Sequence, residues 1–204
     1  MTTSLTYIQL MEMDQQKRAQ FINSISGFRS VALIGSVDLH GQTNLAIFSS
    51  IVHLGSNPPL LGFILRPDSV ERHTLSNIID TGYYTINHIH KNMYVQAHQT
   101  SARYPKSVSE FDATHLTPQF NHDFLAPFVK ESSIQIGMEF KERIEISINQ
   151  TSMVIGEIKF VTYPTHCLLE DGFLEIEKAG TITSTGLDSY HTTQVLQRLP
   201  YAKP

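Results

Sequence analysis

The chain has 204 residues, of which 41% are hydrophobic and 17% charged, and its formal net charge is -4. A chain of this length can bury a sizeable core but is short for two compact domains, so we expect one domain over residues 1–204. The acidic balance and the lack of any dense run of Lys and Arg argue against a nucleic-acid partner.

The first third of the chain predicts a helix followed by strands. Asp14–Ile25 has a modest apolar stripe at helical spacing. Val31–Val37 is rich in β-branched residues, and after the turn Asp38–Gly41 a second strand is expected over Thr43–Val52, which makes a hairpin. Leu60–Leu65 is apolar on both faces and therefore predicts a buried third strand.

A second helix is expected over Asp68–Asp80. Asp68 can cap its first turn, with Glu71 as the reciprocal partner of a capping box. Gly82 stands where a left-handed residue commonly ends a helix. The next segment, Tyr83–Asn87, predicts a fourth strand.

The second half begins with a long polar segment and then returns to strands. Lys91–Pro127 predicts a helix and loops, and a connection of this length usually has a function or packs on a partner. Alternating apolar residues predict half-buried strands over 144–149 and 154–160, and a shorter one over 174–177. About seven strands and few helices indicate a mainly β fold, a single antiparallel barrel with a few peripheral helices.

Several common sites are absent from the sequence. No Rossmann or P-loop glycine motif, no zinc-protease motif and no nucleophile elbow occurs. His88 and His90 are interpreted as partly exposed residues at a strand end, and Cys167, the single cysteine, as a small buried hydrophobe. No signal peptide or membrane-spanning stretch is evident, so we expect a cytoplasmic protein with no membrane contact. Some cofactor enzymes need no acid–base group, so its absence here does not exclude redox chemistry.

The predicted helix after residue 68 offers an anion site. Arg72, His73 and Thr74 fall in its first turns, where free N–H groups and the helix dipole favour negative charge. Arg72 suits phosphate oxygens, Thr74 adds a hydroxyl, and Arg66 can close on the same anion. The alternative is structural, because Glu71 can simply pair with Arg72.

The strand around residue 46 offers a place for a flat ligand. Asn44 is polar, Ala46 is small, and Ser49 and Ser50 follow, so a ring could approach the backbone closely. The alternative is an ordinary strand that faces a partner subunit.

Taken together, these segments resemble the flavin reductase-like family of FMN-binding split barrels, in the family's order and over nearly the whole chain. The matching pieces are Asn44–Ser49, Asn57–Pro59, Arg72–Ile78, Thr81–Gly82, Thr85–Asn87, Ser101, Ser109–Phe111, Leu116–Thr117, Ala126–Pro127, Glu131–Ser132, Gly156–Ile158 and Gly186–Tyr190. The family often has Lys-Asp-Thr where this chain has Arg72-His73-Thr74, so no role is assigned to His73.

The resemblance implies a homodimer with FMN at the subunit interface and hydride transfer from NADH or NADPH to the flavin N5. It implies a possible partner oxygenase or other electron acceptor. The implied flavin- and donor-binding residues are Asn44, Ala46, Phe48, Ser49, Ser50, Arg66, Arg72, Thr74, Ser101 and Tyr190. Two alternatives stay open: a non-enzymatic FMN-binding module (an electron carrier or sensor), and the same barrel holding haem or a pyridoxal-type phosphate.

Overall fold

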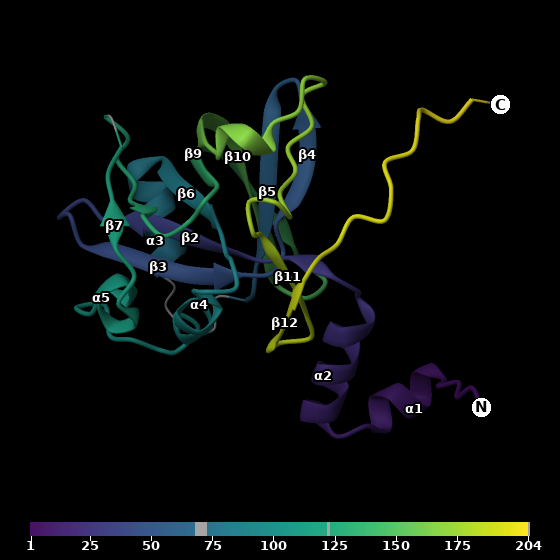
Figure 1. Ribbon diagram of the computed structural model, residues 1–204. Coiled ribbons are helices and arrows are strands. Elements are labelled where there is room, and N and C mark those ends of the chain that lie inside the picture. The colour runs from purple at the N-terminus through teal and green to yellow at the C-terminus, as the bar shows by residue number, and fades with distance from the viewer. Residues whose placement is uncertain (68–72, 122, 204) are drawn as a thin grey trace.

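A computed structural model of the chain describes residues 1–67, 73–121 and 123–203. Its centre is a seven-stranded antiparallel sheet in the order β3-β2-β6-β9-β10-β5-β4 (Figure 1). These strands are β2 (Ala32–Val37), β3 (Thr43–Phe48), β4 (Val52–Ser56), β5 (Pro59–Leu65), β6 (Tyr83–His88), β9 (Gln135–Ile146) and β10 (Thr151–Thr162). The predicted antiparallel, mainly β architecture is confirmed.

Smaller elements surround this sheet. A three-stranded sheet in the order β1-β11-β12 joins β1 (Arg29–Ser30), β11 (Ile182–Thr185) and β12 (Ser189–Thr192), and β7 (Pro118–Gln119) pairs with β8 (Phe128–Val129). The helices are α1 (Tyr7–Glu12), α2 (Gln15–Ile25), α3 (His73–Thr81), α4 (Tyr94–Gln99), α5 (Glu110–Thr114) and the 3₁₀ turn Thr165–Cys167. Within the described ranges, no helix has the length and apolar character needed to cross a bilayer.

Core residues lie on both faces of the sheet. This explains why apolar residues in its central strands do not alternate with polar ones. In β2 every residue is buried: Ile34 packs on one side with Ile78 of α3, and Leu33 on the other with Phe111 of α5. The sheet curls so that β3, at one edge, approaches β5, the strand next to the other edge: the ring centroids of Phe48 and Phe63 lie 4.8 Å apart. This curling makes the sheet a barrel rather than an open layer.

Two helix predictions are confirmed at their ends. Asp14 caps α2 by accepting hydrogen bonds from the N–H groups of Gln16 and Lys17 (3.0 and 3.1 Å). Gly82 is left-handed after α3, with φ of 76°. The predicted capping of α3 by Asp68 and Glu71 lies outside the described residues.

The strand expected over Thr43–Val52 is two strands, which corrects the prediction. β3 ends at Phe48 and β4 begins at Val52. Between them the Ser50 hydroxyl donates to the carbonyl of Ile64 and accepts from its N–H, both at 3.1 Å. These bonds fix the segment that connects β3, at one edge of the sheet, with β4, at the other edge.

Two strand predictions in the second half are also wrong in part. β9 ends at Ile146, Ile148 lies in the following turn, and the side chains of Ile144 and Ile148 are 43% and 92% exposed. These exposures show that the described chain leaves the side chains at this end of the β9–β10 hairpin uncovered. The strand expected over 174–177 is a single bridge between Leu168 and Leu174 followed by turns, closed by a Thr181 N–H bond to the Ile176 carbonyl.

Candidate functional site

A cleft of about 620 Å³ runs along β3 and is bounded by the start of α3, the segment after α4, and β11–β12. Its lining contains every predicted binding residue that the structure describes: Asn44, Ala46, Phe48, Ser49, Ser50, Arg66, Thr74, Ser101 and Tyr190. The tenth, Arg72, lies outside the described residues. His73, the first residue of α3, also lines the cleft.

One end of the cleft holds a buried network of amides and hydroxyls. The Asn44 amide donates to Thr74 Oγ1 at 2.9 Å and to Ser36 Oγ at 3.3 Å, and the Asn77 amide also reaches Ser36 at 3.3 Å. Thr74 thus accepts a bond from Asn44 and keeps its own O–H as a donor. This hydroxyl, at the N-terminal turn of α3, is suited to an anionic oxygen.

The free edge of β3 is closed by α5. The N–H of Leu45 donates to Glu110 Oε2 at 2.9 Å, and the hydroxyls of Thr43 and Ser109 are 2.8 Å apart. Burial raises the pKa of the Glu110 carboxyl above its usual range, although the Leu45 bond opposes this shift. Glu110 therefore holds β3 in place and lines the cleft as well.

The wall after β3 is fixed by the barrel core. Phe48 packs edge-on to Phe63, which in turn contacts Tyr84 at 5.7 Å between ring centroids. The Ser50 hydroxyl is hydrogen-bonded to both the carbonyl and the N–H of Ile64, so the backbone of Ser50 is the part that a ligand can contact. This wall combines an aromatic ring with a firmly held backbone, as the approach of a flat ligand requires.

The opposite wall comes from α4 and β12. Tyr190 pairs its hydroxyl with His98 Nδ1 at 2.8 Å, and its ring lies 5.6 Å from that of Tyr94. Burial raises the pKa of Tyr190, and the charge of Asp188 adds to this effect. Ser101 is exposed in the loop after α4.

The cleft carries an excess of positive charge on an acidic chain. Three arginines line it, and among the described residues none of them is ion-paired: Arg29, Arg66 and Arg103. Elsewhere five basic side chains have carboxylate partners: Lys141, Arg143, Lys159, Lys178 and Arg198. The only carboxylate in the described lining of the cleft is Glu110. The cleft therefore suits an anionic ligand.

The lining residues that were not predicted to bind a ligand include Arg29, His98, Arg103, Glu110 and Ser184. Glu110 and Ser109 were part of the family resemblance, but nothing local shows that they meet β3. Arg29 directly precedes a buried strand, and its place in the cleft depends on pairing with β11, far along the chain.

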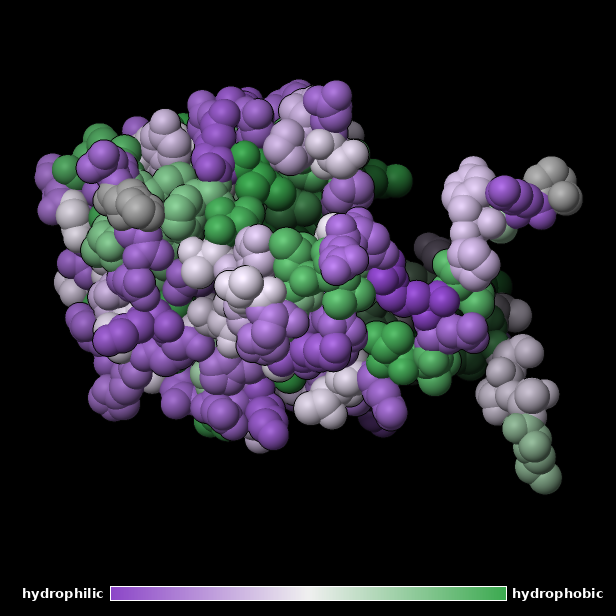
Figure 2. All heavy atoms as spheres, turned by 45° about the horizontal axis from the view of Figure 1, so that its top comes forward, coloured by the Kyte–Doolittle hydropathy of each residue, from purple (hydrophilic) through white to green (hydrophobic). Residues whose placement is uncertain are grey.

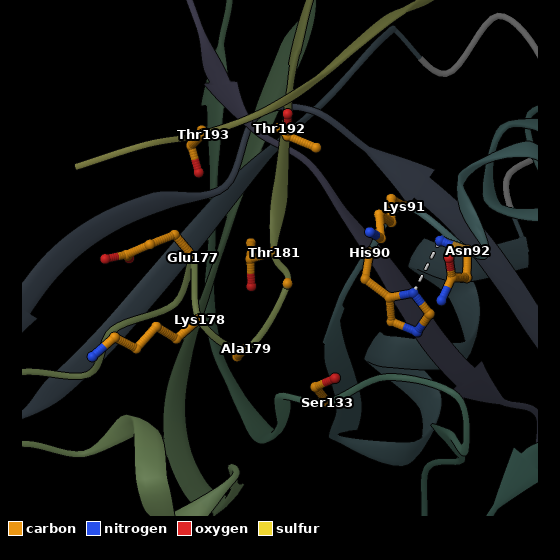
Figure 3. Close-up of a pocket in the computed structure, with 11 residues that line it drawn as sticks. His90, Lys91, Asn92, Ser133, Glu177, Lys178, Ala179, Thr181, Thr192 and Thr193 are labelled. Atoms are coloured by element: carbon orange, nitrogen blue, oxygen red, sulfur yellow. Dashed lines mark hydrogen bonds between the residues drawn. The ribbon is translucent and has the colours of Figure 1, made fainter. Parts of the chain in front are cut away.

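A smaller hollow of about 360 Å³ lies near His90 and the turn 177–181 (Figure 3). His90 Nε2 lies 2.8 Å from the Glu131 carbonyl, and its Nδ1 accepts from the Asn92 N–H at 3.2 Å. His88 Nδ1 instead meets the Thr181 hydroxyl at 3.0 Å. Both imidazoles are partly buried and bound to different partners, and the described residues contain no cluster of metal-ligating side chains. Cys167 is buried, as predicted.

Solved structures share this fold over most of its length. A split-barrel protein from Shewanella frigidimarina NCIMB 400, a presumptive flavin reductase, is 48% identical, with a TM-score of 0.95 over 98% of this chain and 100% of that one. Nitrilotriacetate monooxygenase component B from Bacillus cereus has a TM-score of 0.83 at 22% identity, over 97% and 100%. Flavoredoxin of Desulfovibrio vulgaris (Miyazaki F) has a TM-score of 0.74 at 22% identity, over 86% and 92%.

The match to the first of these proteins confirms the predicted split barrel. The sequence profile of the flavin reductase like domain covers residues 28–172, which include β1 to β10 and most of the cleft wall. The chain therefore belongs to the flavin reductase like domain family.

Proposed function

We propose that the chain is an oxidoreductase that binds FMN in the cleft along β3 and reduces it with NADH or NADPH. The observation that carries this proposal is the gathering, in one cleft lined by three arginines, of nine of the ten binding residues predicted from the sequence. Family membership and the flavin-related names of the similar structures support it. When bound, FMN supplies the ring that accepts the hydride at N5, while the dihydronicotinamide becomes NAD⁺ or NADP⁺.

In this proposal the protein binds and orients rather than exchanging protons. Thr74 donates its hydroxyl to the flavin phosphate, and Arg66 and Arg72 supply positive charge. The backbone around Phe48 to Ser50 contacts the isoalloxazine ring, and Ser101 and Tyr190 line the donor side. Holding the two rings in contact lowers the entropic part of the barrier, which explains a site without a dedicated acid or base.

The phosphate assignment is tested by replacing Thr74 with Val. We expect the FMN dissociation constant to rise by about 10-fold or more while riboflavin affinity is unchanged, since a hydrogen bond to a charged group contributes about 1.5–3 kcal/mol. Fluorescence titration measures both ligands. Thr81→Val is the matched control, because this threonine is on the same helix but bonds to the Asn77 carbonyl. Equal losses for FMN and riboflavin would place the phosphate elsewhere.

A second candidate is a non-enzymatic FMN carrier or sensor, favoured by the likeness to a flavoredoxin. The purified protein with added FMN distinguishes the two. A reductase oxidises NADH or NADPH under these conditions, whereas a carrier binds FMN without turnover. The likeness to a monooxygenase component supports, for the reductase, a partner oxygenase as the consumer of reduced flavin. A protein isolated with haem or a pyridoxal-type phosphate instead of flavin would contradict both candidates.

A further inference from the structure

The end of the cleft away from Thr74 has its own unsatisfied polar groups. Ser184 is 5% exposed, and its hydroxyl has no hydrogen-bond partner among the described residues. The Nε of Arg29 is likewise buried and unpartnered. Both residues line the cleft and face each other in the β1–β11 register. Buried polar groups are normally paired, so two such groups side by side indicate a ligand that completes them.

Arg29 is held firmly but not neutralised. Its Nη2 donates to the Gly186 carbonyl, and its Nη1 reaches Asn23 Oδ1 at 3.5 Å. These partners are neutral, and no carboxylate in the described chain forms an ion pair with this guanidinium. A positioned cation whose charge is not compensated suits an anionic group, above all phosphate.

This end lies well apart from the proposed flavin phosphate. Ser36, beside Asn44 and Thr74, is four residues along β2 from Ala32, which is about 13 Å of strand. Ala32 pairs with Phe48, where the flavin ring is proposed to lie. Arg29 precedes Ala32 in the chain, so it lies beyond the ring on the side away from Ser36 and Thr74. A single phosphate cannot reach both ends, so the second anion belongs to a second ligand.

We propose that Arg29 and Ser184 form a phosphate subsite for the diphosphate of the nicotinamide dinucleotide donor. This inference rests on the proposed function, because it places the donor beyond the flavin ring. Arg29 binds a diphosphate oxygen through its guanidinium, and the Ser184 hydroxyl donates a second hydrogen bond. Neither residue touches the transferred hydride, so both set the affinity for the donor rather than the chemistry.

The test is calorimetric titration with ADP-ribose, which carries the diphosphate but no reactive ring. Arg29→Gln should weaken ADP-ribose binding by about 10-fold or more, as expected for a hydrogen bond to a charged group. Ser184→Ala removes a hydroxyl that has no partner among the described residues, so it should weaken binding while leaving the fold intact. Arg18→Gln is the matched control, since this arginine also bonds to backbone carbonyls but lies outside the cleft lining.

A second measurement separates the phosphates of the two ligands. FMN affinity should be unchanged in both variants, and NADH should show a higher KM, whereas a phosphate-free donor such as 1-benzyl-1,4-dihydronicotinamide should not. Loss of FMN but not riboflavin affinity in Arg29→Gln would place the flavin phosphate here and overturn the inference. ADP-ribose that fails to bind, or binds both variants as it binds the unaltered protein, would also overturn it. Arg29-dependent ADP-ribose binding without any NADH oxidation would leave the subsite standing and contradict the reductase proposal.

Discussion

Tyr84 is a residue of the barrel core whose hydroxyl is not expected to contribute to the stability of the fold. Its side chain is fully buried, burial raises its pKa, and its hydroxyl has no partner among the described residues. An unpaired buried hydroxyl costs about 1–3 kcal/mol. We therefore expect Tyr84→Phe to leave the free energy of unfolding unchanged or to raise it by about 1 kcal/mol, measured by urea denaturation. Tyr104→Phe, which removes a hydroxyl that accepts from Gln99, is the control and should not stabilise. A clear loss of stability in Tyr84→Phe would reveal a buried partner such as water.

His88 predicts a pH dependence of stability. Burial lowers its pKa to about 4, below the ordinary value of 6.5, while Nδ1 meets the Thr181 hydroxyl. The unfolded chain takes up this proton first as the pH falls, so the contribution is complete above pH 6.5 and is lost between pH 6.5 and 4. His88→Gln should flatten that part of the curve, by as much as about 1.4 kcal/mol for each pH unit. The exposed His40, changed to Gln, is the control. Parallel curves for His88→Gln and the unaltered protein would contradict this expectation.

At the scale of elements, the sequence predicts the buried strands of the large sheet. It misses short strands that depend on pairing with a strand far away in the chain. β2 follows from a largely apolar run, and β6 from its aromatic and β-branched residues. β11 and β12 are short and polar, and β11 pairs with β1, about 155 residues away, which no local pattern indicates. α1 has a capping box between Thr6 and Gln9 but buries none of its residues, so it has no apolar face from which a helix could be predicted.

The edge of β3 depends on one carboxylate from α5, and this dependence can be measured. Leu45 is fully buried, so Glu110→Ala leaves its N–H without an acceptor and should cost about 1–3 kcal/mol of unfolding free energy. Glu110→Gln keeps an acceptor oxygen and should lose less. Because the folded-state pKa of Glu110 is raised, its ionisation opposes folding as the pH rises above 4.5. As the pH rises above 4.5, the free energy of unfolding of Glu110→Gln, measured by urea denaturation, should therefore increase relative to that of the unaltered protein. Equal losses of stability in Glu110→Ala and Glu110→Gln would contradict the role given to the Leu45–Glu110 hydrogen bond.

At the scale of the whole molecule, the predicted binding residues come together in the fold even where the elements that carry them were predicted wrongly. Nine of the predicted binding residues are scattered along the chain, yet the structure brings them to one cleft: Asn44, Ala46, Phe48, Ser49, Ser50, Arg66, Thr74, Ser101 and Tyr190. Residue type and the order of segments suggested this grouping, and the role of each residue in ligand binding stays a prediction. Arg29 and Glu110 could not be found in this way, because each reaches the cleft through a contact that only the folded barrel makes.

The two ends of the chain leave apolar surface that the barrel does not cover. α1 and α2 have no buried residue, with Ile8 and Ile25 at 67% and 62% exposure, and the tail carries Leu196 and Leu199 at 100% and 76%. Both termini project from the same side of the barrel, and apolar atoms lie along these projections (Figures 1 and 2). Short helices without a buried face are marginal in water, so they need a lasting partner. The homodimer that the family resemblance implies, with the flavin at the interface, would supply one.

We therefore expect the full chain to be a dimer by light scattering, and the double variant Leu196→Glu, Leu199→Glu to shift it toward the monomer. A fully buried leucine contributes about 1.5–3 kcal/mol, and a charge in its place reverses this gain. FMN affinity should fall with the dimer, because the partner would complete the cleft. Thr193→Glu and Gln197→Glu add the same two negative charges to the tail at exposed polar positions and should keep the dimer. A full chain that is monomeric yet binds FMN at full affinity would show that the cleft is complete within one subunit.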